Sequence, residues 1–339
     1  MKIAKKIVLI TLLVLSMVLA ACQAPTPPPA TEAPAAPADT EAPAAPTEAA
    51  APADSGDATA FVVGYSAAGL IDDLQIGWSE SVQKTIEEAG GKVIIVDSQN
   101  KIAKQVADIE DLLTQNVDYL VVNPVDEAGI VPAIEAANAA NVPVITIDRA
   151  AGGGDVAVHV GFDNYKAGFD AGEYCAQQMG EKGEVAQLEG QAGTSVARER
   201  AQGFNDAIAQ YPDMSVVFDK PTDWDTTKAL AATEDMLSAN PDVQCIWSHA
   251  DAIILGAVQA LEKAGQLDQV ITIGMGMYGG GPEAIKAGQL TASWELYSDQ
   301  LGQIAGQAVV DMQDGKQVEK LISTDMTFVT SDNIDQFLK

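Results

Sequence analysis

Residues 119–149 read YLVVNPVDEAGIVPAIEAANAANVPVITIDR, and the prediction of the fold rests on this stretch. The runs 119–122 and 144–147 are apolar on both faces, which is typical of parallel strands covered by helices on each side. A helical segment lies between them. Two similar runs, 61–63 and 93–96, precede this unit. We therefore predict a parallel sheet with helices on both faces.

A second set of strands follows farther along the chain. Apolar runs at 185–188, 215–218, 243–247 and 270–273 each precede a segment with helical periodicity. The sequence thus predicts two α/β sheets in series. Ligands of such sheets bind beyond the carboxyl ends of the strands. Two sheets that present these ends to each other would form a cleft for a small molecule.

The beginning of the chain has the pattern of an export signal. Three lysines within the first six residues precede a run of apolar or small residues at 7–21. This run is shorter than the roughly 20 residues of a membrane-spanning helix, and it fits a signal peptide over 1–21. Its end, LAAC at 19–22, resembles a bacterial lipobox, so Cys22 is predicted to carry a lipid. The alternative is an ordinary signal peptide followed by a chance cysteine.

Residues 22–58 differ in composition from the rest of the chain. Nine of the 16 prolines lie here, among alanine, threonine and acidic residues, and neither strand nor helix periodicity occurs. Such a segment cannot form a packed core. We interpret it as a stalk that holds the folded part away from a membrane. The remaining residues, 59–339, are enough for two domains.

Composition argues against several classes of function. The net charge of −29 disfavours nucleic-acid binding, which needs clustered lysine and arginine. With two histidines and no Cys/His cluster, the sequence predicts no metal site. Cys175 and Cys245 could form a disulfide in an exported protein or remain buried thiols. Free thiols are favoured, because nothing in their spacing brings the two residues together.

Charged side chains near the predicted strand ends are candidate ligand contacts. Asp148 and Arg149 follow the run 144–147, and together they can accept and donate hydrogen bonds to a polyhydroxylated ligand. The alternative for this pair is a solvated ion pair on the surface. Arg198 and Arg200 open a predicted helix, where one would point to the cleft and the other to solvent.

Trp224 lies in the loop 221–225, where two interpretations remain open. An indole gives a flat apolar wall for the C–H face of a sugar ring. In a loop, however, an aromatic side chain serves equally often to fill a gap in the packing.

A glycine-rich turn from Gly274 to Gly279 has the G-x-G-x-x-G pattern of a dinucleotide site, and Glu295 stands 21 residues after Gly274. The following helix is short and is broken by Gly288, and an exported protein meets little NAD. We therefore interpret the motif as a flexible turn and predict no cofactor. Because no nucleophile elbow, metalloprotease motif or phosphate-binding loop occurs, the sequence predicts a protein that is not an enzyme.

Several blocks of the chain, in order and without gaps, resemble the type I periplasmic sugar-binding proteins, most closely the ribose-binding group. The resemblance covers about 61–328, and its most specific block is LEGQAGTSVARER at 188–200. It implies an α/β fold with two Rossmann-like lobes, whose parallel sheets are joined by three hinge crossings and close on a ligand. The implied lobes are 59–162 plus 296–325 and 163–295 plus 326–339.

The resemblance also implies ligand contacts by position. Asp148, Arg149 and Arg200 match polar contacts of the family, and Asn123 matches a contact at the tip of the third strand. Trp224 stands where the family has a phenylalanine.

Other positions depart from the family pattern. Leu74 and Gln75 replace paired phenylalanines, Ala250 replaces an asparagine, Gly276 an aspartate and Leu296 a glutamine. We keep Gln75, Ala250, Gly276 and Leu296 as candidate contacts, and add Met275 because it follows the run 270–273. Since three of these positions lack the polar side chain of a ribose binder, D-ribose is not expected to be the tightest ligand.

The resemblance implies an extracytoplasmic lipoprotein, anchored to the cell membrane through Cys22. It would bind a monosaccharide, polyol or similar small hydroxylated ligand and deliver it to the permease of an ABC importer. One alternative is a sensor that presents a sugar or signal molecule to a membrane receptor. A third hypothesis is an exported α/β enzyme.

Overall fold

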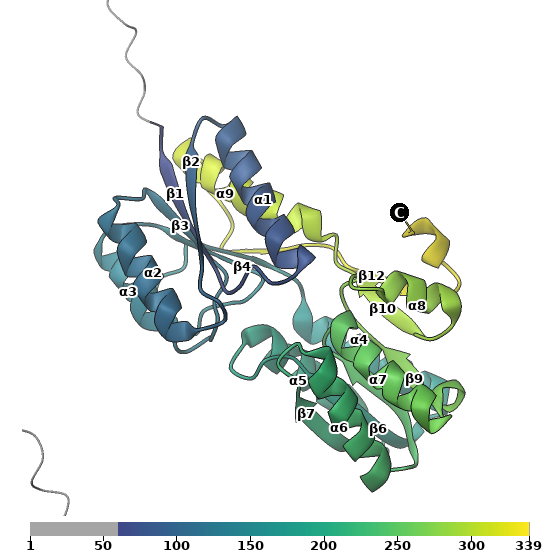
Figure 1. Ribbon diagram of the computed structural model, residues 1–339. Helices are drawn as coiled ribbons and strands as arrows, with labels where there is room; N and C mark the ends of the chain where they lie inside the picture. The colour runs from purple at the N-terminus through teal and green to yellow at the C-terminus, as the bar shows by residue number, and fades with distance from the viewer. Residues whose placement is uncertain (1–59, 339) are drawn as a thin grey trace, which may run out of the picture. The chain divides into compact units, whose positions relative to one another are not determined.

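The computed structural model describes residues 60–338 (Figure 1). The predicted signal peptide, the lipidated Cys22 and the proline-rich segment 22–58 lie outside the described residues. Two six-stranded sheets, each with helices packed against it, make up the described part. No helix within 60–338 is long and apolar enough to cross a membrane.

The first sheet has the strand order β11-β5-β4-β3-β1-β2, and all of its pairings are parallel. We call this sheet and its helices the first lobe. Its elements are β1 (Val62–Ala67), α1 (Asp73–Glu88), β2 (Lys92–Asp97), α2 (Ile102–Thr114), β3 (Tyr119–Val122), α3 (Val131–Ala139), β4 (Val144–Ile147), β5 (Val158–Gly161), α9 (Ser298–Gln313) and β11 (Leu321–Ser323). The four predicted strand runs correspond to β1, β2, β3 and β4 and are confirmed. β5 and β11 were not predicted.

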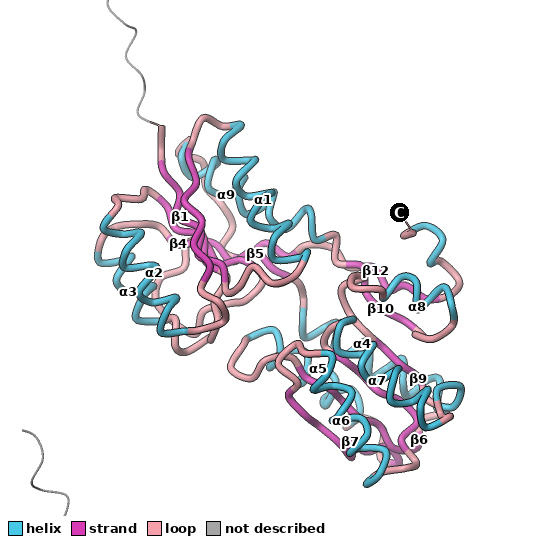
Figure 2. The backbone as a smooth tube through the Cα atoms, viewed as in Figure 1, coloured by secondary structure: helices cyan, strands magenta, loops and turns pink. Residues whose placement is uncertain are grey.

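Helices cover both faces of this sheet, as Figure 2 shows. Side chains of a strand point alternately to its two faces. On β3, Leu120 and Val122 therefore pack with the apolar residues of α2 and α3, while Val121 packs with those of α1 and α9. This two-sided burial explains why the strand runs are apolar at nearly every position.

The second sheet has the order β12-β10-β9-β8-β6-β7, and all of its pairings are parallel except the antiparallel one between β10 and β12. We call this sheet and its helices the second lobe. Its elements are α4 (Asn164–Met179), β6 (Lys182–Glu189), α5 (Ser195–Ile208), β7 (Asp213–Pro221), α6 (Thr226–Ala239), β8 (Val243–Ser248), α7 (Asp251–Ala264), β9 (Ile271–Ile273), α8 (Gly281–Ala287), β10 (Ala292–Glu295) and β12 (Thr327–Thr330). The predicted second set of strands is confirmed as β6, β7, β8 and β9.

The chain passes between the two sheets three times. The connections lie between β5 and α4, between β10 and α9, and between β11 and β12. The lobe limits expected from the sequence fall at these three connections, and they remain a prediction of where each lobe ends.

A disulfide joins Cys175 on α4 to Cys245 on β8, and both residues are fully buried. The preference for free thiols is therefore wrong. The two cysteines are 70 residues apart, and only the packing of α4 on the second sheet brings them together. The sequence carries no local signal of that contact.

The helices α4 and α5 pack closely, because glycines face the partner helix at the contact. A Cβ on Gly168 would lie 2.0 Å from the carbonyl oxygen of Arg200, and one on Gly203 would lie 2.1 Å from that of Tyr165. The two backbones can approach this closely only if neither position carries a side chain. The contact fixes the first turns of α5, which contain Arg200, against the first turns of α4.

Replacing Gly168 by alanine is expected to destabilise the fold by about 1–3 kcal/mol, because the added methyl group must push the two helix backbones apart. Gly77→Ala is the matched control, since Gly77 lies inside α1 and no atom lies within 4 Å of where its Cβ would be. Alanine at this control position should stabilise the helix by about 0.5–1 kcal/mol. Urea unfolding measures both changes. A Gly168→Ala variant as stable as the unchanged protein would contradict this account of the contact.

Candidate functional site

A cavity lies where strand ends of the first lobe meet strand ends of the second lobe. Its volume is about 60 Å³, counted as the space open to the centres of water molecules. At about 10–15 Å³ for each water centre, this is room for about four to six waters. The first lobe and the connection after β10 contribute Ile71, Asp72, Leu74, Gln75, Trp78, Asp148, Arg149 and Leu296. The second lobe contributes Val196, Arg200, Trp224, His249, Ala250, Met275 and Tyr278.

Eight of the ten predicted ligand contacts are among these lining residues: Gln75, Asp148, Arg149, Arg200, Trp224, Ala250, Met275 and Leu296. Asn123 and Gly276 are not among them. Asn123 follows β3 and is buried, where its carbonyl accepts a hydrogen bond from the Gln105 side chain at 2.8 Å. The ligand-binding role of each of these residues remains a prediction.

Asp148 and Arg149 end β4 inside the protein, not on its surface. Asp148 is 7% exposed and Arg149 is 4% exposed, so a solvated ion pair does not describe them. The Arg149 Nε lies 3.8 Å from a carboxylate oxygen of Asp148, and its Nη1 donates to the carbonyl of Pro124 at 3.3 Å. Burial raises the pKa of the Asp148 carboxyl, and the positive charges of Arg149 and Arg200 act in the opposite direction.

Arg200 reaches the cavity from α5 and is held by two fixed hydrogen bonds. Its Nε donates to the side-chain oxygen of Asn164 at 2.8 Å, and its Nη1 donates to the carbonyl of His249 at 2.6 Å. Burial lowers the pKa of the guanidinium to about 10, so Arg200 stays positively charged at neutral pH. Of the two arginines that open this helix, Arg200 is the one that faces the cavity.

Arg198, the other arginine, contacts the first lobe instead of facing solvent alone. Its Nε and Nη2 donate to the two carboxylate oxygens of Glu127 at 3.0 and 2.9 Å. Beside this ion pair, the backbone N–H of Glu127 donates to the carbonyl of Gly193 at 2.8 Å, and the N–H of Ala150 donates to the Ser195 hydroxyl at 2.8 Å. We call the Glu127–Arg198 ion pair the interlobe ion pair.

Trp224 forms part of the cavity wall and contacts both lobes. Its six-membered ring packs so closely on Gly190 that a Cβ there would lie 2.0 Å from the indole. The guanidinium of Arg149 lies 5.8 Å from the centre of the indole ring, within the range of a cation–π interaction. The indole thus fills a gap in the packing and also lines the cavity, while its contact with a sugar ring remains a prediction.

Four buried N–H groups that belong to lining residues have no acceptor within the described part of the chain. They are Trp78 Nε1, Arg149 Nε, Trp224 Nε1 and His249 Nε2. In His249 the other ring nitrogen accepts from the N–H of Gly190 at 3.2 Å, so Nε2 carries the hydrogen. Buried donors are almost always paired in proteins. These four groups are therefore candidate donors to a ligand.

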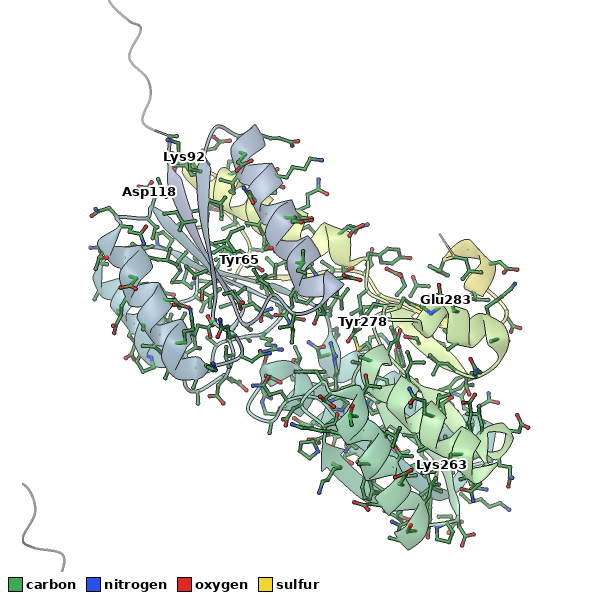
Figure 3. The ribbon with its side chains drawn as sticks, in the orientation of Figure 1. Tyr65, Lys92, Asp118, Lys263, Tyr278 and Glu283 are labelled. Atoms are coloured by element: carbon green, nitrogen blue, oxygen red, sulfur yellow. A yellow bond between two sulfur atoms is a disulfide. The ribbon has the colours of Figure 1, made fainter. Side chains whose placement is uncertain are left out.

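Tyr278 is a lining residue that the sequence did not single out, and Figure 3 shows it in the loop between β9 and α8. Gly276 has a φ of +117°, and a Cβ there would lie 2.6 Å from the Tyr278 ring. The tyrosine ring therefore occupies the space that a side chain at position 276 would need. Gly276 therefore does not leave free volume for a ligand on this side.

The glycine-rich turn encloses a carboxylate of the chain itself. Asp251 accepts hydrogen bonds from the Ser293 hydroxyl at 2.7 Å and from the N–H of Tyr278 at 3.2 Å. A Cβ on Gly274 or Gly281 would lie 2.2 or 2.1 Å from the oxygens of this carboxylate. The acidic side chain that this turn encloses is therefore that of Asp251, which occupies the space beside its glycines.

Comparison with known proteins agrees with this architecture. Residues 63–317 match the family described as periplasmic binding protein domain. The ribose import binding protein of Bacillus subtilis (strain 168) is 37% identical over 276 residues, which cover 81% of this chain and 89% of that protein.

Two solved structures show the same fold over most of their length. An ABC transporter solute binding protein from Bacillus halodurans C-125, with bound myo-inositol, has a TM-score of 0.78 at 26% identity. The match covers 83% of this chain and 98% of that protein. The fructose binding periplasmic domain of a hybrid two component system has a TM-score of 0.78 at 26% identity. The match covers 82% of this chain and 93% of that domain.

The family match and these relatives confirm two predictions made from the sequence and exclude one of its hypotheses. The fold has two parallel-dominated α/β sheets of the type I kind, the relatives are binding proteins and not enzymes, and the third hypothesis, an exported enzyme, is therefore wrong. The chain belongs to the type I periplasmic sugar-binding protein family.

Proposed function

We propose that this chain is an extracytoplasmic solute-binding lipoprotein of an ABC importer, which binds a monosaccharide, polyol or similar hydroxylated molecule in the cavity. The observation that carries the proposal is the burial of Asp148, Arg149 and Arg200 around one small cavity. The relatives named for ribose import and for bound myo-inositol support this class of ligand and the partnership with a permease.

The charges that line the cavity favour an uncharged ligand. Two acidic residues, Asp72 and Asp148, and two arginines, Arg149 and Arg200, line the cavity, so its formal charges balance. Burial holds the pKa of His249 well below its usual value, so this side chain adds no charge at neutral pH. A hydroxyl group can donate to Asp148 and also accept from the buried N–H groups. A neutral polyhydroxylated molecule thus matches both the charge and the hydrogen-bonding groups.

The alternative is a sensor that presents its ligand to a membrane receptor. One observation favours it, because the fructose binding domain with the same fold belongs to a hybrid two component system. We prefer transport, because the ribose import binding protein named above is 37% identical to this chain. The match covers 89% of that import protein.

A thermal-shift screen of the purified protein against sugars and polyols, followed by calorimetry, tests the proposal. A ligand at 100 times its dissociation constant stabilises the folded state by about 2.7 kcal/mol. At least one neutral sugar or polyol is expected to bind, and D-ribose is not expected to bind most tightly. Binding of none of these compounds would contradict the proposal.

Asp148→Asn is expected to weaken the binding of the ligand found in that screen by about 1.5–3 kcal/mol, or roughly 10- to 150-fold in affinity. The variant keeps the size of the side chain but removes its charge and one acceptor. Since binding uses the ionised carboxylate, affinity of the unchanged protein should fall as the pH drops through the raised pKa of Asp148. The variant should lose this pH dependence.

Asp155→Asn is the control, because Asp155 is exposed and pairs with Lys320 away from the cavity. Calorimetry should show unchanged affinity for this variant. If Asp148→Asn binds as tightly as the control, Asp148 does not contact the ligand.

The interlobe ion pair is expected to favour the arrangement in which the two lobes meet. Reversing one charge, as in Arg198→Glu, should weaken ligand affinity about two- to fivefold, because a partly exposed pair contributes about 0.5–1 kcal/mol. A smaller fraction of the protein molecules is then in the binding-competent state, which reduces the apparent affinity for the ligand. The double variant Glu127→Arg with Arg198→Glu should restore affinity. Equal losses in the single and double variants would show that the pairing itself has no role.

Lipid anchoring through Cys22 is the part of the proposal that rests on the sequence at 19–22. Cys22→Ala should prevent lipidation and release the protein from the membrane fraction. Fractionation followed by mass spectrometry of the N-terminus measures both effects. An unchanged chain that is wholly soluble and carries no lipid would rule out the anchor.

A further inference from the structure

Three neighbouring strands of the second sheet end in apolar lining residues. Ala250 follows β8, Met275 follows β9 and Leu296 follows β10, and the strand order places β10, β9 and β8 side by side. All three residues line the cavity and are less than 5% exposed. None of their side chains donates a hydrogen bond, and the thioether of methionine is only a weak acceptor. We call these three residues the apolar wall.

Two of the three backbone carbonyls of the apolar wall are already paired. The carbonyl of Met275 accepts from the N–H of Asp251 at 2.9 Å. The carbonyl of Ala250 accepts from the Ser248 hydroxyl at 2.8 Å and from two N–H groups of α7. These carbonyls are therefore already paired, and a ligand hydroxyl against this wall gains little from them.

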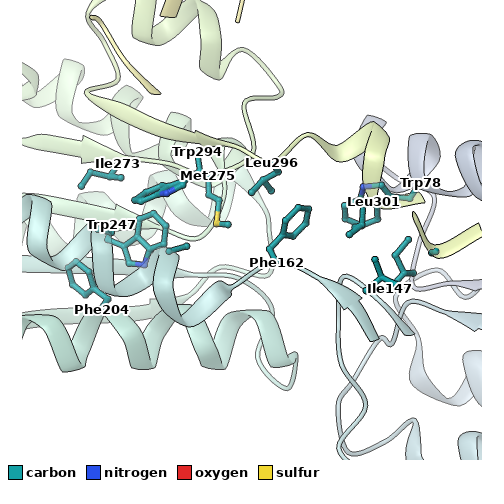
Figure 4. Close-up of a cluster of buried hydrophobic side chains, with 14 of the residues drawn as sticks. Trp78, Ile147, Phe162, Phe204, Trp247, Ile273, Met275, Trp294, Leu296 and Leu301 are labelled. Carbon is teal, nitrogen blue, oxygen red and sulfur yellow. The ribbon is translucent and has the colours of Figure 1, made fainter. Parts of the chain in front are cut away.

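Apolar packing continues behind the wall. Met275 and Leu296 belong to the same buried cluster as Phe162 and Trp294, and Figure 4 shows these four side chains together. His249 precedes Ala250 and Tyr278 lies three residues after Met275, so polar lining residues lie close to the wall along the chain. The charged groups come from other elements, namely β4 for Asp148 and Arg149 and α5 for Arg200.

We propose that the ligand places a methyl or deoxy carbon against the apolar wall, while its hydroxyls contact the charged groups. This inference rests on the proposed function and narrows it to deoxy or C-methyl sugars and polyols. A hydroxyl buried against the wall would lose its water without gaining a partner, which lowers affinity by about ten- to hundredfold. A methyl group at the same place loses nothing and gains apolar contact.

Calorimetry on pairs of sugars that differ by one hydroxyl tests this inference. The probes are D-galactose with D-fucose, L-mannose with L-rhamnose, and D-ribose with 5-deoxy-D-ribose. In at least one pair the deoxy sugar is expected to bind ten times more tightly than its hydroxylated parent. If each parent binds as tightly as its deoxy partner or more tightly, the inference is overturned. If no member of any pair binds but another sugar or polyol in the thermal-shift screen does, the inference is overturned and the proposed function stands; if nothing in that screen binds, the proposed function itself fails.

Two variants connect the preference to the apolar wall. Leu296→Gln adds an amide to the wall and should reduce the deoxy preference about tenfold. Ala250→Ser adds a single hydroxyl to the wall. It measures the same deoxy preference independently if Leu296→Gln disturbs folding. Leu321→Gln is the control, because Leu321 is 59% exposed on β11 and does not line the cavity. An unchanged preference in both Leu296→Gln and Ala250→Ser would show that the wall does not set it.

Discussion

The charges of Asp148, Arg149 and Arg200 are buried around one small cavity, and the rest of the site depends on how this burial is tolerated. An isolated buried charge is strongly unfavourable. Arg200 is stabilised by Asn164 and by the carbonyl of His249. The Asp148 carboxylate forms an ion pair with Arg149 at 3.8 Å and is also influenced by the charge of Arg200, but no side-chain hydrogen bond to it is seen among the described residues. A ligand hydroxyl that donates to Asp148 would supply the partner that the protein itself does not.

The fold provides these charges from both lobes. Asp148 and Arg149 come from the end of β4 in the first lobe, and Arg200 comes from α5 in the second. The close approach of α4 and α5 at Gly168 fixes the position of Arg200 relative to Asn164. A ligand that contacts both lobes stabilises the closed arrangement by the difference between its affinities for the closed and open states. The interlobe ion pair adds a smaller, partly screened contribution outside the cavity.

Much of the fold could be predicted from the sequence, because strands buried on both faces are apolar almost throughout. β3 and β4 have this pattern, whereas β11 is a three-residue strand with exposed residues at both ends and carries no such signal. Asp148 and Arg149 could be found because they directly follow β4. Tyr278 could not, since its place in the cavity depends on the left-handed backbone of Gly276 and on the hydrogen bond between its N–H and Asp251.

A crystal structure of the protein with its tightest-binding sugar or polyol would show whether the buried charges hold the ligand. A single ligand is expected in the cavity, with oxygen atoms at hydrogen-bonding distance, about 2.6–3.2 Å, from the Asp148 carboxylate and the Arg200 guanidinium. Ligand oxygens are also expected beside some of the four buried N–H groups that have no acceptor within residues 60–338. A ligand bound outside the cavity, or one that contacts only one lobe and neither Asp148 nor Arg200, would contradict the account.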